Sequence, residues 1–248
     1  MAARPSALRK AVWWGLDYVD ATRRQLRVLA PRGAARRWAV GDEDRPELVL
    51  LPGVIEHWTF LEPLGDRLHR AGFRVRVVHG IGANTRPIDE TALRVAAALG
   101  REPVPAAGRI VVAHSKGGLI GKRLLIDEET GGDGAPTLGL LGVVAIATPF
   151  HGARRARLIR HPSVRAFLPD DPTIRALAAA AEADARIVSI SGPYDPHVPE
   201  GSDLALGTNL HVATPGHFRV LAAPETAEAV LEGVRLLVAR TAQADGPA

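Results

Sequence analysis

The chain has 248 residues, a length at which one α/β domain can bury a substantial core, and we expect a single domain over residues 1–248. Hydrophobic residues make up 46% and charged residues 23%, which is the balance of a soluble globular protein. No apolar run approaches the roughly 20 residues that a membrane-spanning helix needs. Because the chain contains no cysteine, disulfides, thiolate catalysis and cysteine-ligated zinc are excluded.

The basic isoelectric point does not by itself indicate a nucleic-acid binder. The pI is about 10.1, but the formal net charge is only +4, and most basic residues are arginine, whose high pKa raises the pI. A nucleic-acid site would gather this charge on one face with aromatic residues between, and aromatic residues are only 4% of the chain. We therefore expect no nucleic-acid partner.

The first predicted element is an amphipathic helix within residues 1–25. Apolar residues recur at helical spacing from 6 to 24, with Trp13, Trp14 and Tyr18 among them and arginines on the other side. The tryptophans can pack on the core of the domain, or they can rest on a membrane surface as a peripheral contact. The sequence leaves both interpretations open and favours the first.

This segment does not read as a secretory signal. Basic residues precede the apolar stretch Ala11–Trp14, but Asp17 and Asp20 interrupt any longer hydrophobic region, and no small-residue cleavage site follows. We expect a cytoplasmic protein.

Strands and helices alternate along the rest of the chain. Apolar runs stopped by glycine or proline predict strands, and segments of helical periodicity closed by glycine predict helices. The predicted strands lie at 25–30, 47–53, 73–80, 108–114, 140–150, 186–192 and 208–214, and the predicted helices at 61–72, 90–100, 117–129 and 225–240, before a flexible tail at 241–248. This alternation predicts a three-layer α/β/α sandwich with a mostly parallel central sheet, whose sites form at the carboxyl ends of the strands.

Ser115 directly follows one of these predicted strands. The pattern around it is small-x-Ser-x-Gly, with Ala113 and Gly117 at the two crowded positions of a sharp strand-to-helix turn. Such a turn leaves the serine hydroxyl accessible and points the N–H groups of the following helix toward it. We interpret Ser115 as a nucleophile; the alternative is a glycine-rich turn that carries a bystander serine.

Two other kinds of site are not supported by the same region. A phosphate-binding loop would need glycine where Lys116 stands and serine or threonine where Arg123 stands. A zinc-protease motif H-E-x-x-H does not occur among the nine histidines. We expect neither a metal nor a cofactor.

A serine nucleophile needs a histidine base and a carboxylate that orients it. Asp195 follows the predicted strand 186–192 in a turn rich in proline and glycine, whereas Glu200 and Asp203 lie further from the strand end. We therefore predict Asp195 as the acid.

His217 lies in the loop after the last predicted strand, and we predict it as the base. His211 falls inside that strand and is interpreted as structural, and His197 as a turn residue. His114, next to the nucleophile, is expected to pack or hydrogen-bond behind the turn.

An oxyanion site needs backbone donors. Gly53 ends the strand 47–53 and frees the N–H of Val54, which together with the N–H of Lys116 makes the predicted pair; an ordinary strand-ending turn is the alternative. Both residues would act through the backbone, so their side chains are expected to be free to vary.

These motifs resemble the α/β-hydrolase fold, and within it bacterial lipases and lipase-like esterases. The resemblance rests on "LPGV", "VVAHSKGG", "AIATPFHGA", "YDPHVP" and "GHFRVL", and covers Leu51 to Leu221, roughly two thirds of the chain. The sequence departs from the family's pattern by alanine at 113, which is small enough, and by proline at 52, where histidine is usual. His151 resembles a structural residue of the family.

The segment 153–185 is predicted to be an insertion above the carboxyl edge of the sheet, a candidate cap or lid. It carries Arg154, Arg155, Arg157 and Arg160, which either contact anionic headgroups or form a solvated helix face.

The resemblance implies a serine hydrolase that cleaves carboxylic esters, acyl or lipid esters in particular, through an acyl-enzyme on Ser115. An acyltransferase with the same triad and a binding protein without catalysis are the alternatives.

Overall fold

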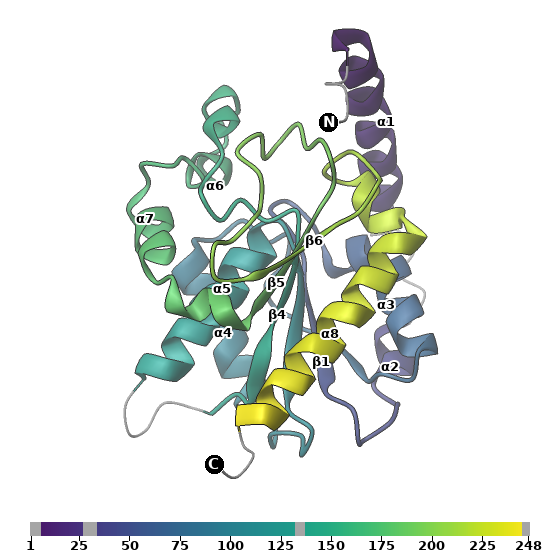
Figure 1. The fold of residues 1–248 in the computed structure, drawn as a ribbon, viewed down its shortest axis with the longest axis vertical. Coiled ribbons are helices and arrows are strands. Elements are labelled where there is room, and N and C mark those ends of the chain that lie inside the picture. Colours follow the sequence, from purple (N-terminus) through teal and green to yellow (C-terminus); the bar gives the residue numbers. More distant parts are fainter. Residues whose placement is uncertain (1–5, 27–33, 132–136, 245–248) are drawn as a thin grey trace.

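The described part of the chain, residues 6–26, 34–131 and 137–244 of a computed structural model, is built round a six-stranded sheet of order β2-β1-β3-β4-β5-β6. Every pair of neighbouring strands in this sheet is parallel, so the carboxyl ends of the strands share one edge (Figure 1). The strands are β1 (Glu47–Leu51), β2 (Val75–Val77), β3 (Arg109–His114), β4 (Leu140–Ile146), β5 (Ile187–Ser191) and β6 (Thr208–His211). Of the predicted strand at 25–30, Gln25 is the last residue of a helix, and residues 27–30 lie outside the described part.

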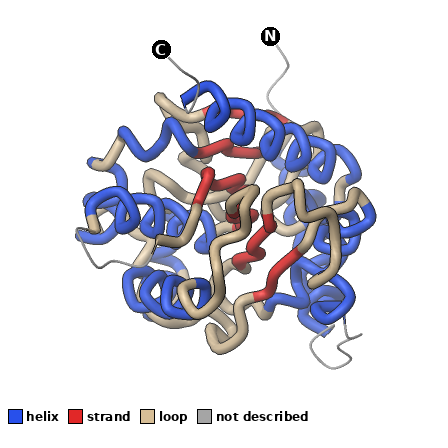
Figure 2. The backbone as a smooth tube through the Cα atoms, turned by 90° about the horizontal axis from the view of Figure 1, so that it is seen from below, coloured by secondary structure: helices blue, strands red, loops and turns tan. Residues whose placement is uncertain are grey.

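Both faces of the sheet are covered, which makes three layers. Alternate strand residues point to opposite faces: Val49 and Val111 belong to one apolar core, and Leu48 and Ile110 to the other. Figure 2 shows the strands in the middle with helices on two sides. The first core is closed by α4 (Ile88–Leu99) and α5 (Lys116–Thr130), and the second by α2 (Ala34–Trp38), α3 (Glu62–Arg70) and α8 (Pro224–Ala244). Helix α8 includes residues 241–244 of the expected tail, and residues 245–248 lie outside the described part.

The segment 153–185 folds as short helices next to the carboxyl edge. They are η3 (Arg154–Leu158), α6 (Pro162–Arg165), α7 (Pro172–Ala179) and η4 (Glu182–Arg186). In Figure 1, α6 rises above the sheet on the same side as the loops that follow β5 and β6. The inner side of the segment 153–185 packs on the first core through Ala156, Val164 and Phe167.

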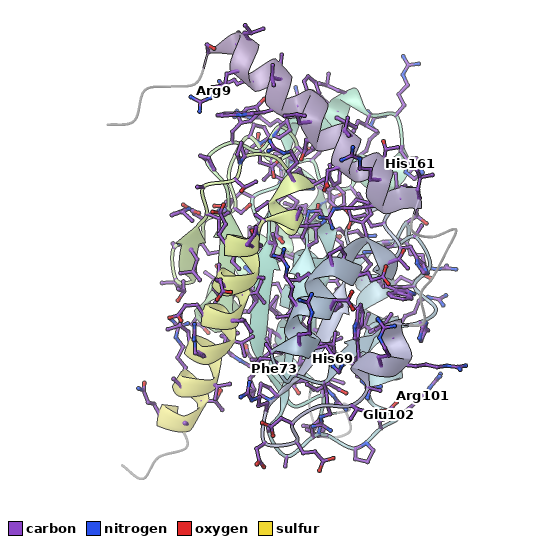
Figure 3. The ribbon with its side chains drawn as sticks, turned by 90° about the vertical axis from the view of Figure 1, so that its right-hand side faces the viewer. Arg9, His69, Phe73, Arg101, Glu102 and His161 are labelled. Carbon is purple, nitrogen blue, oxygen red and sulfur yellow. The ribbon has the colours of Figure 1, made fainter. Side chains whose placement is uncertain are left out.

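Helix α1 (Ala7–Gln25) lies across this same end of the molecule (Figure 3), against η2 (Trp58–Leu61) and η5 (Arg219–Ala222). Its fully buried side chains are charged, Asp17 and Arg24. Arg24 donates to the carbonyl oxygen of Phe60 at 2.8 Å and pairs with Asp20 at 2.6 Å, so its charge is satisfied.

Some apolar residues of α1 pack on the domain and others are exposed. Trp13 packs against Tyr194, with 5.7 Å between ring centroids, whereas Trp14 is 46% exposed. A further stripe points to solvent: Leu8, Val12, Leu16 and Val19. No helix in the described residues is long and apolar enough to cross a membrane.

Candidate active site

Ser115 stands at the turn between β3 and α5 with φ 51° and ψ −119°, a conformation that residues other than glycine rarely adopt. The surroundings hold it there. Its N–H donates to the carbonyl oxygen of Ile146 at 2.8 Å, and a Cβ on Gly117 would come within 2.3 Å of the Leu51 carbonyl oxygen. Ala113 is fully buried. The small residues of the motif are therefore required by close backbone approach.

Thr148, in the sequence AIATPFHGA, supports this turn from the loop that follows β4. Its hydroxyl donates to the carbonyl oxygen of Ser115 at 3.0 Å. A Cβ on Gly118 would lie 2.1 Å from that hydroxyl oxygen, so the second glycine of the motif makes room for this contact.

The loops after β3, β5 and β6 bring Ser115, Asp195 and His217 into one chain of contacts. His217 Nε2 lies 3.0 Å from Ser115 Oγ, and His217 Nδ1 lies 2.7 Å from Asp195 Oδ2. The other oxygen of Asp195 accepts the N–H groups of His197 and Val198 at 2.7 and 3.0 Å, which fixes the direction of the carboxylate. Ser115 and His217 are both buried.

The charges of this pair shift both pKa values. Burial alone would raise the pKa of Asp195, but the charge and hydrogen bond of His217 outweigh it and hold that pKa below its ordinary value. Burial alone would lower the pKa of His217, and the charge and hydrogen bond of Asp195 raise it above its ordinary value. The pair therefore favours an imidazolium beside a carboxylate, the state that forms when the histidine accepts a proton.

The competing acids occupy other places. Glu200 pairs with Arg154 at 2.7 Å, and Asp203 lies 3.6 Å from His211. The His151 ring bonds to the carbonyl oxygen of Asp203 at 2.9 Å.

His197 lies beside His217 but is a poor base. Its ring centroid is 5.0 Å from that of His217, and burial lowers the pKa of His197 to about 3. Its ring thus stays uncharged near neutral pH and packs as a flat, mostly apolar group.

The backbone around Val54 is held by side chains from two segments. The Gly53 N–H donates to Glu56 Oε2 at 2.7 Å, and Asn84 donates to the carbonyl oxygen of Pro52 at 2.7 Å. Ile55 has φ 61°. These contacts fix the conformation of the loop that carries Pro52, and Val54 lines the same cavity as Ser115. Lys116 is the first residue of α5, where backbone N–H groups have no partner within the helix.

The Lys116 side chain is not free to vary, contrary to the expectation from sequence. It is 1% exposed and donates to the carbonyl oxygens of Asn84, at 2.8 Å, and Arg86. Burial lowers its pKa to about 8. This ammonium group ties α5 to the loop that also supports Pro52.

Three further polar residues lie at the site: His114, which was expected to pack or hydrogen-bond behind the turn, and Glu56 and Asp17, to which the sequence analysis assigned no role there. His114 Nδ1 lies 2.9 Å from Glu56 Oε1, and its Nε2 bonds to the carbonyl oxygen of His217 at 3.0 Å. Asp17 of α1 accepts backbone N–H groups from the His217 loop. One signal existed for Asp17: an acidic residue between the aromatic residues of a predicted amphipathic helix.

A cavity of about 650 Å³ opens next to Ser115 and His217. Its walls are mostly apolar and come from α1, the loop after β1 and the segment 153–185, with Trp14, Phe60, Ile159 and Phe167 among them. The segment 153–185 therefore forms one wall of the cavity that Ser115 lines. Among the described residues, no group of three or more His, Asp or Glu side chains is placed to hold a metal ion.

Neither a protein-family model nor a curated protein matches this sequence. Solved structures do match its fold. The mature lipase BlEst2 of Bacillus licheniformis gives a TM-score of 0.62 at 14% identity, over 78% of this chain and 94% of that one. A Nitrososphaera gargenis structure described among carboxylesterases gives 0.53 at 13% identity, over 81% and 93%. The Paleococcus ferrophilus monoacylglycerol lipase gives 0.51 at 17%, over 79% and 96%.

At these identities the likeness establishes the fold alone. The chain has the α/β-hydrolase fold, and the predicted fold class is confirmed.

Proposed function

We propose that this protein is a serine hydrolase that cleaves carboxylic esters. The observation that carries the proposal is the unbroken series of contacts from Asp195 through His217 to Ser115 Oγ, at 2.7 and 3.0 Å, beside an apolar cavity. A strained serine with a buried histidine and carboxylate is the arrangement that activates a hydroxyl for acyl transfer.

In the first half of the reaction, Ser115 Oγ attacks the ester carbonyl carbon while its proton passes to His217 Nε2. Asp195 holds the ring with Nδ1–H toward its carboxylate, so Nε2 carries the lone pair, and it stabilises the imidazolium. The backbone N–H groups of Val54 and Lys116 receive the negative oxygen of the tetrahedral intermediate. The C–O bond to the alcohol then breaks, and His217 returns the proton to that alcohol.

In the second half, water replaces the alcohol. The oxygen of a water molecule attacks the acyl-enzyme carbonyl, and His217 takes a proton from this water. Collapse of the intermediate breaks the bond to Ser115 Oγ, which regains the proton, and a carboxylic acid leaves. Interception by an added alcohol would instead form a new ester, so product analysis with such an acceptor separates hydrolysis from acyl transfer.

We assign the substrate's acyl part to the apolar cavity. Cavities of about 300 to 1,000 Å³ enclose most of a small ligand, and this one, at about 650 Å³, has walls suited to a hydrocarbon chain. Acyl or lipid esters are therefore the substrate class that we expect.

The rim of this cavity supports peripheral contact with a lipid surface. Large apolar residues on the rim are exposed: Trp14, Tyr18, Ile55, Leu158 and Ile159. Arg157 and Arg160 flank the last two in sequence, so cationic groups border the apolar tip of the segment 153–185. Such a combination binds anionic membrane surfaces. The cytoplasmic location expected from the sequence stays a prediction.

The proposal is tested by hydrolysis of p-nitrophenyl esters from short to long acyl chains. We expect a preference for longer chains, and we expect Ser115→Ala to lower kcat by about 10⁴ to 10⁶-fold while binding is largely kept. Ser191→Ala is the matched control, because Ser191 Oγ also lies 3.2 Å from a histidine, His211, but outside the cavity. A Ser115→Ala rate within tenfold of the parent would refute the assignment.

A further inference from the structure

Asp17 places a carboxylate from the N-terminal helix directly under the loop that carries His217. One oxygen accepts the N–H of His217 at 3.0 Å. The other accepts the N–H groups of Phe218 and Arg219 at 2.8 and 2.9 Å. The partners are separated by 200 to 202 residues in sequence, and the Asp17 side chain is fully buried.

The His217 loop is shaped to receive this carboxylate. Consecutive N–H groups at the start of η5 point the same way and form a small concave site for a negative group. Gly216 precedes them with φ +112°, and a Cβ at that position would lie 2.5 Å from Asp17 Oδ1. The chain therefore uses glycine where the carboxylate comes closest.

The opposite side of the His217 backbone is held as well. Its carbonyl oxygen bonds to His114 Nε2 at 3.0 Å, and His114 Nδ1 bonds to Glu56. The N–H, the carbonyl and the imidazole of His217 thus each have a separate partner: Asp17, His114 and Asp195. Only the Asp17 contact comes from outside the α/β core of the fold.

We propose that Asp17 is a positioning residue for His217, so that helix α1 forms part of the catalytic apparatus. This inference rests on the proposed function. Asp17 touches neither substrate nor Ser115; it sets the place of the His217 backbone, and through it the 3.0 Å separation of Nε2 from Ser115 Oγ. A misplacement of about 1 Å in such a contact can slow a reaction on the order of 100-fold.

The charge of Asp17 gives the proposal a second readout. The groups that face His217 are the carboxylates Asp195, Glu56 and Asp17 and the rings of His114 and His197. The carboxylates favour the protonated imidazole. Removing the charge at position 17 should therefore lower the pKa of His217, a shift that a loss of overall stability alone would not produce.

Asp17→Asn is the most informative substitution, because it keeps the shape of the side chain. The amide oxygen can keep its bonds to Phe218 and Arg219, but the amide NH₂ then faces the N–H of His217, donor against donor. We expect kcat to fall by about tenfold or more with KM within about twofold. We also expect the acid limb of the kcat–pH profile to move to lower pH.

Arg24→Met is the matched control. Arg24 is the other buried charged residue of α1, and it anchors the helix to Phe60 without contacting the His217 loop. We expect it to lower the unfolding temperature while kcat and the pH profile stay as in the parent. An Asp17→Asn protein with parental kcat and pH profile, destabilised only as Arg24→Met is, would overturn the proposal.

Measurements on the unaltered protein cover the case in which Asp17→Asn does not fold. Burial raises the pKa of Asp17 above its ordinary value, although its backbone partners oppose the shift. In an NMR titration, the amide protons of residues 217, 218 and 219 should therefore move together with one carboxyl group, at a pH above the ordinary pKa of an aspartate. Amide shifts that do not follow a carboxyl titration would overturn the proposal.

The same experiments keep the two proposals separate. A parent protein without turnover dependent on Ser115 would refute the proposed function, whatever the amide titration shows. A parent with that turnover and an unimpaired Asp17→Asn variant would refute only the role of Asp17.

Discussion

The part that His217 plays in the proposed reaction depends on the charges around its ring. In that reaction His217 acts as a base only when its ring is neutral, and the charge of Asp195 raises its pKa above the ordinary value of 6.5. Because the folded pKa is raised, activity should fall as the pH drops through a value above 6.5. Neighbouring carboxylates thus increase the basicity of the ring but narrow the pH range in which it works.

The pH profile of kcat/KM on a soluble ester measures this directly. We expect an acid limb above pH 6.5 in the parent and a limb at lower pH in Asp195→Asn, together with a fall in kcat on the order of 10⁴-fold. An unshifted limb in Asp195→Asn, or a parental limb below 6.5, would show that the raised pKa of His217 does not control turnover.

Both partners of this pair contribute stability, and the two contributions depend on pH in opposite directions. The raised pKa of His217 gives stability that is present at low pH and is lost as the pH rises through the folded pKa. The lowered pKa of Asp195 gives stability that is present above about pH 3.8 and is lost as the pH falls. The ion pair therefore stabilises the fold most between these limits.

At the scale of elements, α1 and the segment 153–185 face each other across the mouth of the cavity. Each contributes exposed apolar residues to the rim, Trp14 and Tyr18 from α1 and Leu158 and Ile159 from the segment. In α1 the charged residues Asp17 and Arg24 are buried, and the apolar residues Leu8 and Val12 are exposed. This is the reverse of the usual distribution of charged and apolar side chains, since buried charges are costly unless they are paired. Hydrogen bonds inside the protein explain why the charged residues can be buried. A lipid surface outside would explain why the apolar residues are exposed.

Vesicle binding tests this contact. We expect Arg157→Gln with Arg160→Gln to weaken binding to vesicles that contain an anionic phospholipid by about tenfold, since each basic residue near such a surface contributes about 1 kcal/mol, less when it is only partly engaged. Added salt should weaken binding of the parent.

Arg101→Gln is the control for charge alone, because Arg101 is exposed at the end of the molecule away from α1 (Figure 3). Equal losses in the Arg101 variant and the double variant would argue for unspecific attraction rather than contact through the rim.

At the scale of the whole molecule, the features that could be predicted from sequence are those that residues close together in the chain determine. The strand-to-helix turn at Ser115 needs small neighbours because the backbone comes within 2.3 Å of the place where a Cβ at Gly117 would stand. A short sequence motif is therefore enough to predict this turn. The parallel order of the strands then brings Asp195 and His217 to the same edge. Both could be found from their places after predicted strands.

The remaining contacts could not be predicted because they join single residues far apart in the chain. Glu56 meets His114 across 58 residues, and Asp17 meets the His217 loop across 200. No periodicity or spacing marks such pairs. The Lys116 side chain was expected to be free because the role assigned to it was in the backbone, yet the fold buries it against residues 84–86.

The central claim is that the fold makes one serine, Ser115, reactive through His217. Covalent labelling with a fluorophosphonate probe, followed by mass spectrometry of the digested protein, tests it most directly. We predict one adduct per chain, located on Ser115, absent from Ser115→Ala and much slower to form in His217→Ala. Well-folded protein that takes up no probe, or an adduct that lies on Ser191 or another residue, would contradict the account.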